Sequence, residues 1–429
     1  MSRRFKTRGA RNAAAAERAA RVAPKSIGLA YADDLGRIYF DDEVTPLADG
    51  GDVRVPRRDE LILAPPGTLP TMLPGRAPLL EDFTVPDRRV TLGALLPAGY
   101  TRLLLPAFRT GPNAPTLPLF GYTYACVVDD ELYVAAMQTD ASDDWTPRTF
   151  AAGELEAIVD ARRERDPGNG VLAQLATCSL SYACFTAQNV FLERGEAALP
   201  VSPKCNARCI GCISEQAADA GIPSPQTRVR DETNAEELSR IAIAHLEAVP
   251  DGIVSFGQGC EGEPLLRATT IARAIERIRA ATRAGTININ TNGSMPQSLQ
   301  MLVDAGLDAV RVSLNSFRPL TYAAYYRPIG YDLDDVFASA RLGVAAKLRV
   351  SLNLLTHPGV TDDAREVEAA DAFLAEVPVT MVQTRTLNID PDRYFAVVGR
   401  PETAPLGMRT ALHRIGLRGA SVGNFTHAH

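Results

Sequence analysis

The chain has 429 residues, of which 46% are hydrophobic and 22% charged, and its net charge is −6. This composition excludes collagen-like chains, wholly disordered chains and disulfide-stapled miniproteins. No stretch approaches the roughly 20 apolar residues of a membrane-spanning helix, so we expect no membrane partner. Seven cysteines in a chain without a secretory signal favour a reducing compartment, and we expect a cytoplasmic protein.

Residues 1–25 form a basic segment that contrasts with the rest of the chain. Eight lysines and arginines stand there against Glu17 alone, so this segment carries +7 and the remainder −13. Such a segment could contact nucleic acid or an acidic partner. We interpret it as a disordered, solvated arm, because it is rich in alanine and contains a single aromatic residue, Phe5. The acidic body would repel a phosphate backbone, so we do not expect a nucleic-acid partner.

Residues 26–195 are predicted to form a separate, proline-rich α+β region. Residues 51–120 contain 12 of the 30 prolines, which excludes long helices there. A hairpin is predicted from β-rich runs at 123–128 and 132–137, which flank the polar turn 129–131. Helices are expected at 151–163 and 170–194. Nothing in this region indicates a function.

Residues 196–395 alternate between strand and helix patterns. Strands are predicted at 198–202, 252–256, 286–290, 309–314, 349–354 and 379–384, with helices at 234–248, 266–284, 296–305, 333–346 and 362–376. This alternation predicts parallel strands joined by right-handed crossovers, either a partial barrel or an open doubly wound sheet. We expect residues 396–429 to form a C-terminal tail.

Polar or glycine-rich segments follow the first three predicted strands. They are Pro203–Cys212, Gly257–Pro264 and Asn290–Ser294. The carboxyl ends of parallel strands share one edge of a sheet, where ligands bind. The three segments together therefore predict a site.

The first of these segments contains Cys205, Cys209 and Cys212 in C-x3-C-x2-C spacing. Three thiolates on one loop can hold three corners of an iron–sulfur cube and leave one iron without a protein ligand. The competing interpretation is zinc, but closed zinc sites use four ligands. No fourth cysteine or histidine lies near this loop.

The cysteine triplet, Gly262-Glu263-Pro264 and Asn290–Ser294 together resemble the radical S-adenosylmethionine (radical SAM) superfamily. The resemblance covers roughly residues 197–390 and implies a core domain over 196–395, a partial (β/α)6 TIM-like barrel. It implies a 4Fe–4S cluster on the three cysteines, with the amine and carboxylate of SAM chelating the open iron. The cofactor-binding residues that it implies are Gly262, Glu263, Asn292, Ser313, Asn315 and Asn353.

Within this resemblance, Glu263 would lie beside the methionine amine, and Gly262 would allow close approach of the backbone. The competing interpretation of Glu263 is a carboxylate that only caps a helix N-terminus. Gly211 stands where the family usually has an aromatic residue, so adenine packing is expected from elsewhere, with Ile210 as a candidate. Glu261 replaces the first glycine of the family's Gly-Gly-Glu motif.

The resemblance implies an enzyme that cleaves SAM reductively to a 5′-deoxyadenosyl radical, which abstracts hydrogen from an unidentified substrate. Electrons would come from a reductant such as flavodoxin or ferredoxin. The alternative is a non-enzymatic iron–sulfur or zinc module on an α/β scaffold. Three further cysteines are left open between a second cluster, a thiol pair and simple packing: Cys178, Cys184 and Cys260.

Overall fold

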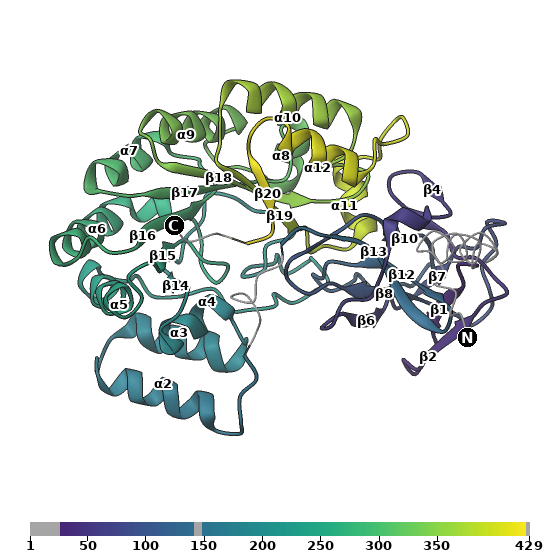
Figure 1. Cartoon of the computed structure of the whole chain (residues 1–429), viewed down its shortest axis with the longest axis horizontal. Coiled ribbons are helices and arrows are strands. Elements are labelled where there is room, and N and C mark those ends of the chain that lie inside the picture. Colours follow the sequence, from purple (N-terminus) through teal and green to yellow (C-terminus); the bar gives the residue numbers. More distant parts are fainter. Residues whose placement is uncertain (1–25, 141–147, 426–429) are drawn as a thin grey trace, which may run out of the picture.

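A computed structural model describes residues 26–140 and 148–425 of the chain (Figure 1). The basic arm predicted at 1–25 lies outside these residues. The described residues form an antiparallel β region, three helices that follow it, and a parallel sheet covered by helices.

The N-terminal region contains a large antiparallel sheet and two small ones. In spatial order, the large sheet contains β2 (Ile38–Asp41), β1 (Leu29–Ala32), β8 (Val90–Leu95), β12 (Thr123–Val128), β13 (Glu131–Gln138) and β5 (Leu61–Leu63), with β6 (Leu69–Met72) beside β8 and β9 (Tyr100–Arg102) beside β13. The small sheets are β10 (Leu105–Pro106) with β3 (Ala48–Asp49) and β4 (Val53–Arg54), and β11 (Phe108–Thr110) with β7 (Arg76–Pro78).

The structure agrees with the predicted hairpin. Strands β12 and β13 pair in an antiparallel register that aligns Val128 with Glu131. The turn between them places Asp129 and Asp130 at φ of 55° and 63°, a conformation that aspartate tolerates better than most residues. In the proline-rich stretch the regular structure is limited to short strands and one 3-10 turn, η1 (Arg58–Glu60).

Three helices connect the two regions: α2 (Glu154–Glu164), α3 (Gly170–Ser181) and α4 (Phe185–Leu192). A single helix was predicted over 170–194, but the chain bends by 116° between α3 and α4. Ala183 occupies the left-handed region at this bend, with φ of 48°. No single helix in the described part of the chain is long and apolar enough to cross a membrane; only this bent pair passes that test by length and composition.

The second region is built on a parallel sheet of seven strands in sequence order. These are β14 (Glu196–Leu199), β15 (Ile253–Phe256), β16 (Thr286–Thr291), β17 (Ala309–Leu314), β18 (Arg349–Thr356), β19 (Met381–Thr386) and β20 (Ser421–Gly423). Between them lie α5 (Ala235–Ala248), η3 (Pro264–Arg267), α6 (Ala268–Ala281), α7 (Pro296–Ala305), α8 (Pro319–Tyr326), α9 (Leu333–Ala345), α10 (Ala364–Glu376), α11 (Pro391–Val398) and α12 (Met408–Gly416).

This arrangement confirms the predicted fold class, a partial TIM-like barrel preceded by a separate α+β region (Figure 1). The described strands leave the barrel open, because β14 and β20 form the two edges of the sheet. The segment expected to be a C-terminal tail instead contributes α12 and β20, which pairs in parallel with β19. The hydrophobic face of α12, which includes Met408, Leu412 and Ile415, is buried and explains why this segment folds onto the barrel.

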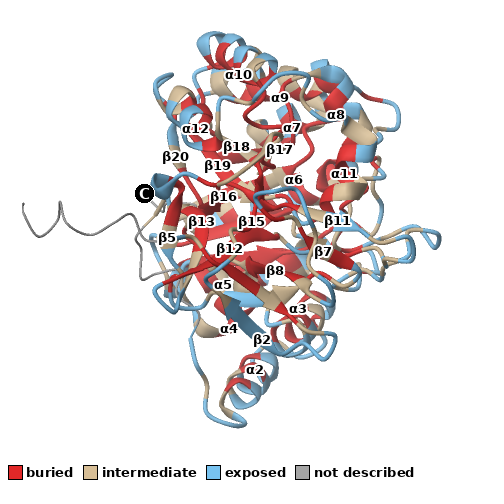
Figure 2. Ribbon diagram, turned by 90° about the vertical axis from the view of Figure 1, so that its right-hand side faces the viewer, coloured by how far each residue is buried: buried red, intermediate tan, exposed pale blue. Residues whose placement is uncertain are grey.

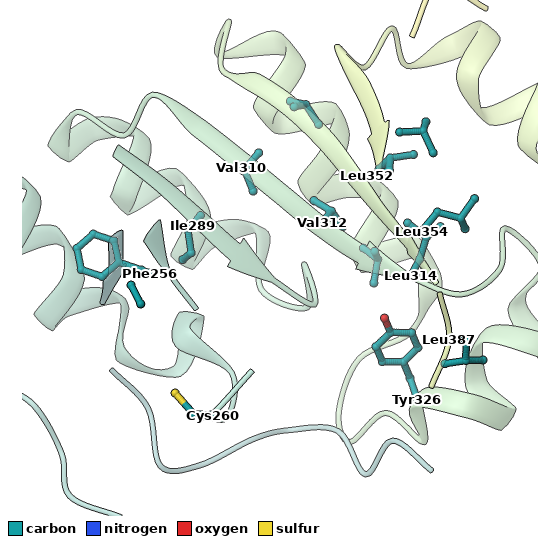
Figure 3. Packing of buried hydrophobic residues seen from close by; sticks show 14 of the residues in the cluster. Phe256, Cys260, Ile289, Val310, Val312, Leu314, Tyr326, Leu352, Leu354 and Leu387 are labelled. Atoms are coloured by element: carbon teal, nitrogen blue, oxygen red, sulfur yellow. The ribbon is translucent and has the colours of Figure 1, made fainter. Parts of the chain in front are cut away.

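Side chains alternate along the parallel strands. Val310, Val312 and Leu314 of β17 lie beside Leu352 and Leu354 of β18 and are buried in the hydrophobic core (Figure 3). The intervening positions carry polar side chains that line the inside of the barrel. Burial is concentrated in the centres of both sheets, while the outer faces of the helices are exposed (Figure 2).

Elements that precede the barrel pack near both edges of its sheet. Strand β9 contacts β19, which lies next to the edge strand β20, and the connecting helix α4 contacts the other edge strand, β14. Arg102 of β9 is completely buried and donates hydrogen bonds to the carbonyls of Leu387 (3.0 Å), just after β19, and Thr356 (3.3 Å), at the end of β18. The N-terminal region therefore covers the open side of the barrel.

Candidate active site

A cavity of about 560 Å³ extends from the carboxyl ends of the strands into the barrel. It is lined by residues from the cysteine loop, from the segments after β15 and β16, and from strands β17 to β19. Most of the predicted site residues meet at this cavity: Cys205, Cys209, Cys212, Gly262, Glu263, Asn292, Ser313 and Asn353.

The three loop cysteines are half-buried and face this common space. Backbone hydrogen bonds hold their loop against α8: Arg208 N donates to Tyr326 O (3.0 Å) and Ile210 N donates to Tyr325 O (3.1 Å). Burial raises the pKa of Cys205 to about 11 and that of Cys209 well above its ordinary value. In the absence of a metal these thiols are therefore protonated, and metal binding would release their protons.

The thiols fit an iron–sulfur cluster better than a single zinc ion. Within residues 26–140 and 148–425, no group of three or more histidine, cysteine, aspartate or glutamate side chains converges on one metal position. A cube instead takes each thiolate on a different iron, so the ligands need not converge. Arg228 adds a positive charge at this site, since its Nη2 lies 3.4 Å from the sulfur of Cys212.

Glu263 lies at the mouth of the barrel, where its side chain is almost completely buried. Its carboxylate caps η3 by accepting from Leu265 N (2.9 Å), and it also accepts from Asn292 N (2.8 Å) and from the Thr291 hydroxyl. Burial raises its pKa to about 7, against these hydrogen bonds, which lower it. The capping role is thus present in the structure, and the same carboxylate also lines the cavity.

Glu261 and Gly262 connect the second segment to the start of the cysteine loop. The carboxylate of Glu261 accepts from the backbone nitrogens of Val201 (2.7 Å) and Ser202 (2.6 Å). A Cβ at Gly262 would lie 2.0 Å from Lys204 O, so only glycine fits there. The close backbone approach at Gly262 in this structure is therefore to the cysteine loop.

The aromatic residue missing before the third cysteine is replaced from another part of the chain. A Cβ at Gly211 would lie 2.9 Å from the hydroxyl oxygen of Tyr325, which comes from α8. Tyr325 and Tyr326 line the cavity, whereas Ile210 is buried and does not. The expectation that Ile210 provides adenine packing is therefore not supported by its position.

The predicted asparagines separate into two groups. Asn292 Nδ2 donates to Asn206 Oδ1 (2.9 Å), and Asn353 Nδ2 donates to Ser313 Oγ (3.3 Å), while the buried Oδ1 of Asn353 has no partner among the described residues. Asn315 lies outside the cavity lining, and its Nδ2 donates to the hydroxyl of Tyr394 (3.0 Å) and to Thr321 O (3.3 Å). The prediction for Asn315 is therefore not supported by the structure.

Charged residues inside the barrel were not predicted. Glu196, Arg311 and Arg385 line the cavity below the strand ends, on β14, β17 and β19. Each stands at an inward position of a strand whose neighbouring positions are apolar or small. A charge in the middle of a buried parallel strand is rare, and that signal was available in the sequence.

Three cysteines outside the loop lie near one another: Cys178, Cys184 and Cys260. The contact with Cys178 and burial raise the pKa of Cys260. Cys184 N donates to Cys178 O (3.0 Å). All seven cysteines are free thiols in the structure.

The family comparison agrees with this site. Residues 199–372 match the family model described as the radical SAM superfamily. This span contains the three cysteines, Glu263, Asn292 and strands β15 to β18. Most of the barrel domain is therefore similar to the radical SAM superfamily, whose members use a 4Fe–4S cluster and SAM.

Part of the chain is also similar to individual proteins of known name. The chain is 34% identical over 166 residues to a GTP 3′,8-cyclase from Heliobacterium modesticaldum, covering 38% of this chain and 46% of the relative. It is also 34% identical over 190 residues to a probable GTP 3′,8-cyclase from Methanococcus maripaludis, covering 42% of this chain and 58% of the relative. The matches thus span about half the length of these relatives.

A solved structure matches more weakly. The radical SAM methyltransferase from Sphaerobacter thermophilus is 16% identical, with a TM-score of 0.37 over 53% of this chain and 64% of that chain. That score is too low to add to the family match.

Proposed function

We propose that the chain is a radical SAM enzyme that uses Cys205, Cys209 and Cys212 to hold a 4Fe–4S cluster. The observation that carries this proposal is the meeting of the three thiols with Glu263 and Asn292 at one cavity. A cluster of this kind, once bound, supplies the electron for reductive cleavage of SAM. The electron would come from a reductant such as flavodoxin or ferredoxin.

The chain's own residues would bind and orient SAM and exclude water. Glu263 provides a carboxylate for the methionine amine, a charge-assisted contact. The unpartnered Oδ1 of Asn353 is an acceptor for a sugar hydroxyl, and Tyr325 and Tyr326 provide flat apolar surface. The N-terminal region covers the open side of the barrel and would keep a reactive radical away from water.

The proposal is tested by anaerobic reconstitution followed by iron and sulfide analysis. We expect about four irons and four sulfides per chain, and formation of 5′-deoxyadenosine when SAM and dithionite are added. Replacing Cys205, Cys209 and Cys212 together by Ala should abolish both signals. The matched control replaces Cys126 by Ala, because Cys126 is a buried cysteine of the N-terminal sheet.

Zinc in place of iron, or a loaded cluster without SAM cleavage, would instead support the non-enzymatic alternative. Iron that persists in the triple variant would point to the group of Cys178, Cys184 and Cys260. Because the relatives are named GTP 3′,8-cyclases, GTP is the first substrate to add to this assay.

A further inference from the structure

The inside of the barrel is polar along several neighbouring strands. Ser255 of β15 donates to Glu196 Oε1 (2.5 Å), and Asn288 Nδ2 of β16 donates to Ser255 Oγ (3.0 Å). Ordinary TIM barrels fill this space with branched apolar side chains. Here it remains a cavity lined by charged and amide side chains, so this part of the cavity is suited to a polar ligand.

Arg311 is buried inside the barrel, and Glu196 is its one acidic partner in residues 26–140 and 148–425. Its Nη2 lies 2.9 Å from Glu196 Oε1, but the contact lacks hydrogen-bond geometry, and this buried nitrogen has no hydrogen-bond partner in those residues. Glu196 already accepts from Ser255. The guanidinium of Arg311 therefore has an unused donor next to the cavity.

Arg385 is the second arginine on this wall. Its guanidinium has no hydrogen bond or ion pair with residues in the described part of the chain, although it lines the cavity. Burial and the nearby charge of Arg311 lower its pKa, while Glu196 and Asp140 raise it. Asp140 does not line the cavity and accepts the backbone N–H of Asn424.

Two other carboxylates line the cavity, Glu261 and Glu263. In the described part of the chain neither forms an ion pair with Arg311 or Arg385, and both accept backbone N–H groups at the barrel mouth. A buried guanidinium without a full set of acceptors is costly, and an anionic ligand would remove that cost. Guanidinium groups also match the two-oxygen geometry of carboxylates and phosphates.

We infer that Arg385, with Arg311 beside it, binds an anionic group of the substrate, a carboxylate or a phosphate, inside the barrel. This inference rests on the proposed function, since it places the substrate beneath SAM in the same cavity. Glu196 holds Arg311 in position, and Arg385 provides the free donors. The pair is a specificity determinant and takes no part in SAM cleavage.

The test measures ligand binding by calorimetry on the full chain with its cluster reconstituted and SAM at saturation, so that the carboxylate of SAM does not compete. Two matched pairs of probes separate the sources of the anion: GTP against guanosine, and benzoate against benzamide. We expect one acid to bind and its neutral counterpart to bind at least tenfold more weakly. Arg385→Gln should weaken binding of that acid by about 10- to 100-fold, and Arg385→Lys by less.

Arg341→Gln is the matched control, because Arg341 lies on an outer helix and pairs with exposed Glu376. This variant should bind the acid as tightly as the unaltered chain does. Failure of both acids to bind, equal affinity for a neutral counterpart, or unchanged affinity in both Arg385 variants would overturn the inference. Cluster content and 5′-deoxyadenosine formation are measured on the same samples. If the unaltered chain cleaves SAM but binds no anion, this inference alone is contradicted. If the unaltered chain does not cleave SAM, the proposed function is contradicted.

Discussion

Two buried carboxylates at the mouth of the barrel differ in what their oxygens already bind. Glu261 accepts three backbone N–H groups, from Val201, Ser202 and Gln258, and so holds the strand end in place. Glu263 accepts two backbone N–H groups, from Leu265 and Asn292, and the hydroxyl of Thr291. The proposed contact with the methionine amine is assigned to Glu263 because it is the acid of the Gly-Glu-Pro segment that resembles the family's motif.

Glu263→Gln should weaken SAM binding by roughly 1.5–3 kcal/mol, the contribution of a hydrogen bond to a charged group. Cluster content should not change, because the thiolate loop is untouched. Calorimetric titration of SAM into the reconstituted protein measures the effect, with Glu261→Gln as the matched variant. Equal losses in the two variants would mean that both carboxylates serve the amine.

The residues that could be predicted from the sequence stand at strand ends next to recognisable turn or ligand motifs. Cys205, Glu263 and Asn292 are of this kind, and the structure brings them to one cavity. Arg311 stands in the middle of β17 and Arg385 is the last but one residue of β19, and only the alternation of inward and outward positions marks them. Asn315 follows a strand as Asn292 does, but its Nδ2 donates a hydrogen bond to the Tyr394 hydroxyl. No local sequence pattern indicates this contact.

At the scale of single elements, prediction succeeded where two periodicities contrast. Helix α7 and strand β17 begin and end where they were predicted. Helical spacing begins at Pro296, and it gives way to strand alternation after Gly306. The break between α3 and α4 has no glycine or proline to mark it. Strand β20 has three residues, which are too few to show an alternating pattern. It forms because it can pair in parallel with β19.

The contact between the cysteine loop and α8 is open to a double-mutant test. Gly211→Ala places a Cβ against the Tyr325 hydroxyl and should lower the free energy of unfolding by about 1–3 kcal/mol, as overpacking does. In a Tyr325→Phe background the same change should cost less, because the nearest atom is gone. Chemical denaturation of the four proteins measures the coupling, and additive effects would contradict the contact.

Helix α10 is tied to the segment after β17 by a buried carboxylate. Glu366 accepts from Ser316 Oγ (2.6 Å) and Phe317 N (2.5 Å), and burial raises its pKa to about 7. Between pH 4.5 and pH 7 the folded state therefore keeps the Glu366 carboxyl protonated, whereas the unfolded state has released that proton. The stabilisation that protonated Glu366 gives the folded state is complete below pH 4.5 and is lost as the pH rises to about 7.

Glu366→Gln should remove this pH dependence, since the amide can donate to Ser316 and accept from Phe317 at any pH. Relative to the unaltered chain, the variant should gain up to about 3 kcal/mol in free energy of unfolding between pH 4.5 and pH 7.5. Denaturant titrations across this range measure the difference. Glu376→Gln is the control on the same helix, because that carboxylate is exposed and its pKa is lowered by Arg341, and it should show no such gain.

At the scale of the whole molecule, the barrel depends on the N-terminal region to cover its open side. The hydrophobic core reflects this dependence, because one continuous cluster includes Tyr124 of the antiparallel sheet, Leu172 of α3 and Val312 of the barrel. Thr101 and Thr384 also join their hydroxyls across the boundary at 2.7 Å. We therefore expect the two regions to unfold together in a single transition.

Arg102 is the residue on which this expectation can be tested. Its guanidinium donates to Tyr122 O within the N-terminal region and to Thr356 O and Leu387 O of the barrel region, in complete burial. Arg102→Met keeps most of the volume but removes the arginine donor from three buried carbonyls, of which Thr356 O still accepts from Leu387 N (3.1 Å). The loss of these bonds, partly offset by removing a buried charge, should lower the free energy of unfolding by about 3 kcal/mol.

The control is Arg109→Met, because Arg109 is an exposed arginine of the same region that makes a long hydrogen bond (3.5 Å) to Phe83 O. Denaturant unfolding followed by both far-UV circular dichroism and the near-UV circular dichroism of the buried tyrosines measures stability and cooperativity together. The unaltered chain and the Arg109 variant should give coincident transitions of equal stability. If the Arg102 variant were as stable as the control, the N-terminal region would be attached to the barrel by its apolar contacts alone.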